Sequence, residues 1–340
     1  MSAMPENWEP PVDAWQSRFA PGVTEIVFGY FGVQYAPGGD IGAFERWWDE
    51  AGVAAPAPSF MTRAHVRDAS DMENTVFIAY WPSKSDFDAW WETVAVSAWW
   101  EDEARLSGPF GVWREVYCVP VDHFETLHSS QTEHGVASIA QDLGEPIKEH
   151  AYWGGMRDRV PASSQLDFSS PWAEMPEPDL KATRGARVRV AVPDNVCLIR
   201  SGQDLTLSSG KERETYQDVV RPHLTAGMAF LRDNPKDTSC FSCRLMDEVS
   251  MDGAPKQQTF GLAAFRSMKD LEDWSKSHPT HLAIFGSFFQ MMEAHQGQLD
   301  LKLWHEVLVA DGANTIADYT NCHPRTGFLP WCPTIQEVDE

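Results

Sequence analysis

The chain has 340 residues, of which 43% are hydrophobic and 12% aromatic, so its length suits about two domains with a substantial core. Its 50 acidic and 27 basic residues give a formal net charge of −23, which argues against binding to nucleic acid or to an anionic membrane surface. The sequence has no run of 18 apolar residues, and residues 1–11 are polar, acidic and proline-rich, unlike an export signal. These properties predict a soluble cytoplasmic protein.

After an N-terminal extension over 1–22, the first half of the chain follows the order strand, helix, strand, strand, helix, strand. Strands are expected over 25–35, 59–66, 75–81 and 112–119. Helices are expected over 41–51 and 85–104. Ser83 followed by Asp86 gives the second helix a start signal, a hydroxyl that can cap the first amides with an acid three positions later. This order is that of a ferredoxin-like unit, which we expect to span 23–131.

The next stretch, 132–194, is rich in proline, glycine and charge and shows no regular pattern. It contains the run from His150 to Arg159, which is too aromatic and too charged for a plain linker. A long stretch of this kind is usually a linker or a functional loop, and the run favours the functional loop.

The second half repeats the order of the first and is expected to form another ferredoxin-like unit over 195–310. Its strands are expected over 196–203, 239–247, 259–265 and 301–309, and its helices over 211–233 and 267–292. Ser267 and Asp270 repeat the helix-start signal of the first half. The tail, 311–340, contains a polar and aromatic segment over 321–328 that could cover an opening or reach a partner subunit.

Local likeness between the halves supports a duplication. The segment Trp113-Arg114-Glu115-Val116 is matched by Trp304-His305-Glu306-Val307, and 32–34 is matched by 201–203. We therefore predict an α+β fold of the dimeric α+β barrel type, in which two ferredoxin-like units form a β-barrel core surrounded by helices. The halves differ where chemistry can arise, because Gly32 stands opposite Ser201, Ser97 opposite His281, and Arg114 opposite His305.

An apolar stripe follows Pro279, a residue suited to the first turn of a helix. The stripe comprises Trp274, His281, Leu282, Phe285, Phe288, Phe289 and Met292. Its single ionisable group, His281, is either a structural histidine bonded to a backbone carbonyl or an imidazole offered to a metal in an aromatic cavity, as on the proximal side of a haem.

His305 lies in the middle of a predicted strand, where alternation places it on one face with Leu303 and Val307. An imidazole can both give and take a proton near neutral pH, so a buried one is a candidate acid–base group as well as a candidate core residue. Ser201 is read as a serine at a strand end, and Arg157 and Arg159 as members of a surface ion-pair run with Asp158.

Motifs of several other chemistries are missing or incomplete. The sequence contains no Ser-His-Asp order, glycine-rich phosphate loop or H-E-x-x-H helix. Cys240 and Cys243 have the C-x-x-C spacing of zinc and redox sites, but the second ligand pair is missing and the segment reads as an apolar strand.

Six segments resemble, in matching order, those of the haem-dependent aldoxime dehydratases. They are EHAYWGGMRDRVP (149–161), IRSGQD (199–204), FLRDN (230–234), SHPTHLAIF (277–285), LWHEV (303–307) and NCHPRTG (321–327). The likeness extends over 15–328, nearly the whole chain, although 286–297 is a few residues longer than in some members, which bears on substrate size. The resemblance implies a homodimer of duplicated ferredoxin-like barrels that binds haem b, ferrous in the active form.

The resemblance also implies a reaction and residue roles. The reaction is dehydration of R–CH=N–OH to R–C≡N, with the substrate bound to ferrous haem through nitrogen. His281 corresponds to the proximal haem ligand, and we expect Phe285 to contact the haem. His305 corresponds to the distal catalytic histidine, Ser201 to the distal serine and Arg159 to the distal arginine. No haem is expected in the first half.

Two other functions suit the same cavity. A distal histidine with an arginine would also suit a haem peroxidase-like or chlorite-decomposing enzyme, since both groups can assist O–O cleavage. A non-catalytic haem carrier would use the cavity alone and would have little need of the three distal polar groups.

Overall fold

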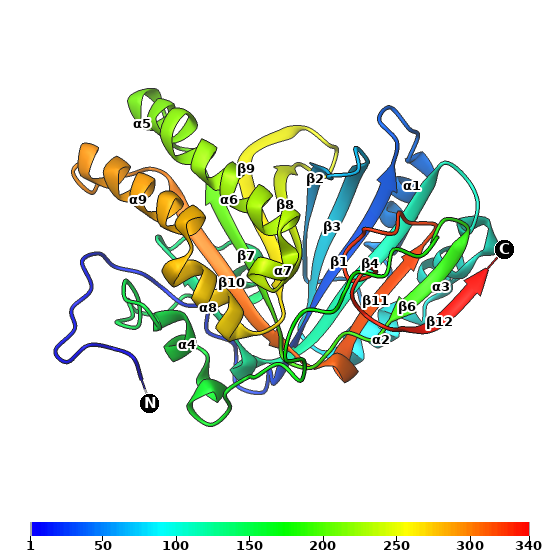
Figure 1. The fold of residues 1–340 in the computed structure, drawn as a ribbon, viewed down its shortest axis with the longest axis horizontal. Helices are drawn as coiled ribbons and strands as arrows, with labels where there is room; N and C mark the ends of the chain where they lie inside the picture. Colours follow the sequence, from blue (N-terminus) through cyan, green and yellow to red (C-terminus); the bar gives the residue numbers. More distant parts are fainter. Residues whose placement is uncertain (1, 340) are drawn as a thin grey trace.

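Twelve strands join into one strongly curved sheet in the computed structural model, which describes residues 2–339 (Figure 1). Neighbouring strands pair antiparallel throughout, in the order β12-β6-β11-β4-β1-β3-β2-β8-β9-β7-β10-β5. The strands are β1 (Glu25–Tyr35), β2 (Phe60–Arg67), β3 (Glu73–Trp81), β4 (Phe110–Pro120), β5 (Phe124–His128), β6 (Ala186–Val190), β7 (Val196–Asp204), β8 (Cys240–Val249), β9 (Pro255–Phe265), β10 (Lys302–Ala310), β11 (Thr315–Thr320) and β12 (Thr334–Asp339).

Each half contributes four of the expected strands to this sheet. The first half gives the order β4-β1-β3-β2 and the second gives β8-β9-β7-β10, so β2 and β8 meet at the junction. These eight strands agree with the sequence prediction to within a few residues at each end. Several of them, such as β1 and β3, are buried on both faces, so short runs rich in apolar, β-branched and aromatic residues were sufficient to find them.

Four strands were not predicted, and two of them join the half to which they do not belong in sequence. β5 follows β4 along the chain but pairs with β10, whereas β11 follows β10 but pairs with β4. The other two, β6 and β12, extend the sheet beyond β11. The expectation of an irregular stretch over 132–194 was thus wrong, because this stretch supplies β6, and the tail after 310 supplies β11 and β12.

The expected long helices are each interrupted. The helix expected over 267–292 divides at Pro279, whose ring cannot continue the hydrogen-bond pattern of the preceding turn. The helix expected over 211–233 contains a π-helical turn, Tyr216–Val220, between α5 and α6. The helices are α1 (Gly42–Ala51), α2 (Lys84–Trp91), α3 (Val94–Glu101), α4 (Gly155–Arg159), α5 (Gly210–Thr215), α6 (Arg221–Asp233), α7 (Pro235–Thr238), α8 (Met268–Ser277) and α9 (Pro279–Ala294).

Both predicted start signals cap a helix. The hydroxyl of Ser83 accepts a hydrogen bond from the backbone N–H of Asp86 at 3.1 Å, at the start of α2. The hydroxyl of Ser267 accepts one from the N–H of Asp270 at 3.2 Å, at the start of α8. Within residues 2–339, no helix is long and apolar enough to cross a membrane.

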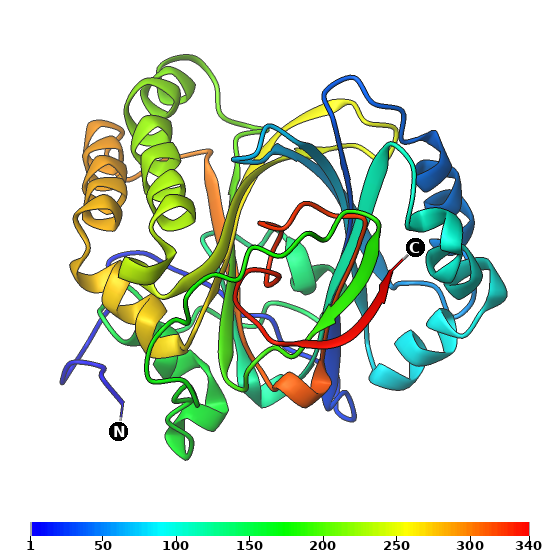
Figure 2. The same ribbon diagram turned by 45° about the vertical axis from the view of Figure 1, so that its right-hand side comes forward.

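The curved sheet has an inner and an outer face, and both are buried. The inner face holds a core of aromatic and aliphatic side chains, and the tail runs across it (Figure 2). Phe328 of the tail is fully buried in this core, and most of the tail segment over 321–328 is buried with it, although Arg325 is exposed. On the outer face, α1–α3 cover the strands of the first half, and α6, α8 and α9 cover those of the second.

A tryptophan lying over a glycine fixes the register of both halves. Trp113 pairs with Gly32 across β4 and β1, and Trp304 pairs with Gly202 across β10 and β7. A Cβ on either glycine would lie 2.1 Å from the indole ring, so no side chain fits at these positions. Gly32 therefore corresponds to Gly202, and the expected match of Gly32 with Ser201 was wrong by one residue.

Candidate active site

His305 and Ser201 lie side by side on the outer face of the second half. They are direct partners in the register of β10 and β7. The next pair on the same face consists of Val307, two residues after His305, and Ile199, two residues before Ser201. Both pack into the apolar cluster between this face and the helices. The predicted facing of His305 is thus confirmed, whereas Ser201 occupies the interior of β7 and not its end.

A buried carboxylate joins two of the predicted residues. Glu125 on β5 accepts hydrogen bonds from Arg159 Nε at 2.6 Å and Nη2 at 3.1 Å. Its Oε1 also lies 2.9 Å from Nε2 of His305, and that nitrogen is 3.1 Å from Arg159 Nη2. The side chains of Glu125 and Arg159 are 0% and 3% exposed, and that of His305 is 23% exposed. The three therefore form a buried network of which the imidazole is the most exposed member.

The electrostatics of this network keep Glu125 ionised. Burial alone would raise the pKa of the Glu125 carboxyl, but the neighbouring Arg159 and His305 outweigh burial and hold this pKa at about 2. When Nε2 of His305 has a proton, it can donate to this carboxylate. When Nε2 has none, it can accept from Arg159. A partner thus exists for the imidazole in either state, which suits a group that gives and takes a proton.

The ion-pair run of α4 divides between surface and interior. Arg157 forms an ion pair, as expected, but its partner is Glu272 on α8 at 2.7–3.2 Å and not Asp158, and the pair is partly buried. Arg159 instead points inward, where Nη1 also donates to the backbone oxygen of Glu149 at 2.6 Å. The expectation of a surface position was therefore wrong for Arg159. It lies two positions after Arg157 in α4, so the two side chains point to opposite sides of this helical turn.

His281 lies on α9, in an aromatic setting. Its ring centroid is 4.7 Å from that of Trp274 and 6.4 Å from those of Trp153 and Phe285. Its Nδ1 is buried without a hydrogen-bonding partner of acceptable geometry, and burial lowers the pKa of the imidazole. Ile284, one turn further on, packs into the same cluster as Ile199 and Val307. α9 therefore faces the side of the sheet that bears His305 and Ser201.

The aromatic side chains near His281 are open to solvent to an unusual degree. Phe285, Phe289 and Trp153 are 42%, 48% and 43% exposed, although the rings of Phe285 and Phe289 contact one another. The stripe expected on α9 is thus not a single buried face. An exposed aromatic surface beside a buried imidazole is what a large, flat, apolar ligand with a bound metal would cover, so these residues fit a haem.

The corresponding face of the first half is filled by protein. Arg114 occupies the position equivalent to His305, and Asp318 on β11 pairs with it at 2.7 Å and with Arg189 at 2.5 Å. The guanidinium carbon of Arg114 lies 3.4 Å from the ring centroid of Trp91. Both halves thus place a buried carboxylate between two cationic or ionisable groups, but only the second leaves an imidazole partly accessible.

Sequence reasoning missed Glu125 because it did not predict β5. The segment from Phe124 to His128 alternates in burial only weakly and follows β4 after a single turn of 3-10 helix. Its two aromatic or apolar residues at 124 and 127 do not follow the spacing of two residues that indicates a strand. A carboxylate in such a segment has no local signal of its role, since its partners lie 34 and 180 residues away.

The C-x-x-C pair lies inside β8. Cys240 and Cys243 are both buried, and burial raises the pKa of each thiol, that of Cys243 to about 12. Thiols with raised pKa values form few thiolates and react slowly. Across residues 2–339, no group of three or more His, Cys, Asp or Glu side chains is arranged to hold a metal ion.

Comparison with known proteins identifies the family. The model of the haem-containing dehydratases matches residues 29–328. The chain is 37% identical to a phenylacetaldoxime dehydratase of Bacillus sp. (strain OxB-1), covering 100% of this chain and 97% of that protein. It is also 37% identical to an aliphatic aldoxime dehydratase of Rhodococcus globerulus, covering 96% and 92%.

Solved structures agree with these matches. A crystal structure of an aldoxime dehydratase superimposes with a TM-score of 0.90 at 33% identity, covering 99% of this chain and 96% of the other. An aldoxime dehydratase crystallised with butyraldoxime gives a TM-score of 0.90 at 34% identity, covering 98% and 93%. The chain therefore belongs to the haem-containing dehydratases, the family of lyases that includes these aldoxime dehydratases.

Proposed function

We propose that this enzyme removes water from an aldoxime, R–CH=N–OH, to give the nitrile R–C≡N, with one ferrous haem b in each chain. The observation that supports this most directly is the buried network of Glu125, Arg159 and His305 beside Ser201. The relatives named as phenylacetaldoxime and aliphatic aldoxime dehydratases, and the one crystallised with butyraldoxime, support the substrate class.

The residues around α9 are those that would hold the haem. His281 would bind the haem iron, and Phe285, Phe289 and Trp153 would contact the haem. Covering these three half-exposed side chains removes apolar surface from water, which favours binding. When bound, ferrous haem supplies an iron that can take the oxime nitrogen as a ligand and weaken the N–O bond.

The polar side chains supply the proton transfers. Hydroxide is a poor leaving group, so the oxime oxygen must receive a proton as the N–O bond breaks. His305 donates this proton, a general-acid contribution of typically about 10²–10⁴-fold. Its free base then accepts the proton from the oxime carbon, so the imidazole returns to its starting state. Ser201 and Arg159 hold the oxime oxygen toward the imidazole by hydrogen bonds, which restricts its orientation.

We infer that the chain is a duplication of two ferredoxin-like units, over 23–131 and 195–310, with an extension over 1–22, a connecting functional loop over 132–194 and a tail over 311–340. Support comes from the equivalent orders β4-β1-β3-β2 and β10-β7-β9-β8, and from the two equivalent Trp–Gly pairs. One haem per chain follows, because Trp91 and Arg114 occupy the corresponding place in the first half.

Two substitutions test the assignment. Replacing His305 with Ala should leave the haem spectrum intact while nitrile formation under anaerobic, dithionite-reduced conditions falls by about 10²-fold or more. Replacing His281 with Ala should instead lower haem content at purification. Normal turnover in the first variant, or normal haem content in the second, would refute the corresponding role. Activity of ferric enzyme with peroxide, and none of ferrous enzyme with aldoxime, would replace the proposed reaction by peroxidase-like chemistry.

A further inference from the structure

The N-terminal segment Ser2–Ser17, here called the strap, runs along the outer edge of β5. Trp15 and His128 exchange two backbone hydrogen bonds of 2.9 Å. The backbone N–H of Ser17 donates to the hydroxyl of Thr126 at 2.8 Å. Because β5 is the last strand of the sheet and bears Glu125, these bonds hold the edge on which the buried carboxylate depends.

The same strap also holds the loop that bears Arg159. The hydroxyl of Ser2 and the backbone N–H of Ala3 donate to the carboxylate of Asp158 at 2.7 and 2.9 Å. Further along, the indole N–H of Trp8 donates to the backbone oxygen of His150 at 3.0 Å. His150 precedes α4 and Asp158 lies within it, so the strap is bonded both to the segment that leads into this helical turn and to the turn itself.

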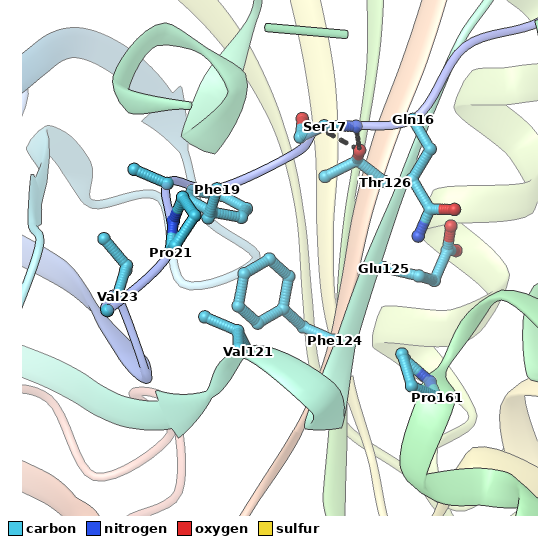
Figure 3. Close-up of a pocket in the computed structure, with 12 residues that line it drawn as sticks. Gln16, Ser17, Phe19, Pro21, Val23, Val121, Phe124, Glu125, Thr126 and Pro161 are labelled. Atoms are coloured by element: carbon cyan, nitrogen blue, oxygen red, sulfur yellow. Dashed lines mark hydrogen bonds between the residues drawn. The ribbon is translucent and has the colours of Figure 1, made fainter. Parts of the chain in front are cut away.

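Gln16 is the residue at which these two sets of contacts meet. Its chain neighbours bind β5, while its side-chain Nε2 donates to the backbone oxygen of Arg159 at 3.2 Å. Figure 3 shows the side chain of Gln16 directed toward the side of Glu125, at the border of a cavity of about 330 Å³ that Phe124 and Pro161 also line. The cavity leaves room for movement beside the ion pair, so packing alone does not immobilise this region.

We propose that Gln16 is a positioning residue of the dehydratase, which fixes the backbone of Arg159 against Glu125 and through them sets the orientation of His305. This inference rests on the proposed function, in which Arg159 and His305 act on the oxime. The physical reason is that Glu125 and Arg159 come from two separate elements, and the strap is bonded to both. A small displacement of a catalytic group lowers the rate strongly because the reacting atoms must be aligned.

The test compares Gln16→Met, which keeps the length of the side chain but removes the amide donor, with Glu9→Gln. Glu9 is a matched control in the strap, since it is 75% exposed and pairs only with Lys148 at the surface. We expect Gln16→Met to lower kcat about three- to tenfold, the range for loss of one hydrogen bond, with KM and the haem spectrum unchanged. Glu9→Gln should match the parent protein.

A double-mutant cycle separates positioning from general damage. In an Arg159→Ala background, Gln16→Met should cause little further loss, because its effect passes through the residue already removed. Hydrogen exchange provides a readout independent of activity, and amides over 147–159 should exchange faster in Gln16→Met than in Glu9→Gln.

The outcomes distinguish this inference from the proposed function. Full activity of Arg159→Ala would refute the role given to the arginine. If Arg159→Ala is impaired but Gln16→Met behaves like Glu9→Gln in both kcat and exchange, the inference about the strap is wrong. Losses that add in the double variant would show that Gln16 acts on another part of the protein, which would equally overturn it.

Discussion

Glu125→Gln tests the energetics of the buried network, because it keeps the shape of the side chain and removes the charge between Arg159 and His305. The pKa of this carboxyl falls from the reference value of 4.5 to about 2 in the folded protein. The gap corresponds to about 3 kcal/mol of stability, at 1.36 kcal/mol per tenfold change in proton affinity. Removing one partner of a buried ion pair typically costs about 3–5 kcal/mol, which agrees in size.

The sign of the pH dependence follows from the lowered pKa. The stabilisation is fully present above the unfolded pKa of about 4.5 and is lost as the pH falls toward about 2. At pH 7 we expect the free energy of unfolding of the variant, measured in urea, to be about 3 kcal/mol lower than that of the parent. For a chain of this length, its Tm should be about 5 °C lower. The two proteins should converge between pH 4.5 and 2. A variant whose stability follows that of the parent at every pH would refute the assignment of an ionised, paired carboxylate.

The first half provides a matched control for activity. Asp318 is likewise a buried carboxylate between two cations, Arg114 and Arg189, which outweigh burial and lower its pKa. Asp318→Asn should therefore also reduce stability near neutral pH. Because it lies on the filled face, turnover per bound haem should not change, whereas Glu125→Gln should lower it. Equal loss of turnover in both variants would mean that the effect is one of general stability.

Three further substitutions probe other parts of the site and core. Ser201→Ala should retain haem but lower kcat, measured by nitrile formation, and an unchanged kcat would remove the serine from the mechanism. His128 is 1% exposed, and its pKa is lowered to about 3, mainly by burial and then by the charges of nearby histidines. The folded protein therefore loses stability as the pH falls from about 6.5 to 3, because the unfolded chain binds the proton more readily. His128→Leu should flatten urea-unfolding stability over that range, and an unchanged slope would contradict this origin. Gly202→Ala would place a Cβ 2.1 Å from the ring of Trp304. It should lower the free energy of unfolding by about 1–3 kcal/mol and alter the near-ultraviolet circular dichroism spectrum. A Tm equal to that of the parent protein would contradict the close packing.

Much of the framework could be predicted because it depends on local patterns. The eight central strands are short apolar runs that can be found from sequence, and the serines that cap α2 and α8 act within three residues. The facing of His305 followed from the alternation of side chains along its own strand. The one-residue error in matching the halves arose where glycine permits contact with an indole ring, a constraint that only the paired strand reveals.

The network of Glu125, Arg159 and His305 could be predicted only in part, because it depends on which strands exchange between the halves. β5 leaves the first half to bring Glu125 beside His305, and β11 leaves the second half to bring Asp318 beside Arg114. Neither exchange has a signal in the sequence of the strand concerned, since both depend on pairing with residues far along the chain. The facing of the histidine was therefore predicted from its own strand, whereas the carboxylate bonded to it was not predicted.

The exchange also limits how far the two halves can be treated as independent units. The imidazole of His305 belongs to the second half, Glu125 to the end of the first, and Arg159 to the segment between them. The strap then ties β5 to the Arg159 loop from the far end of the sequence. The network of Glu125, Arg159 and His305 therefore requires elements from three separate parts of the chain. The two four-stranded parts of the sheet supply the framework, and the exchanged and connecting segments supply Glu125 and Arg159 of the network.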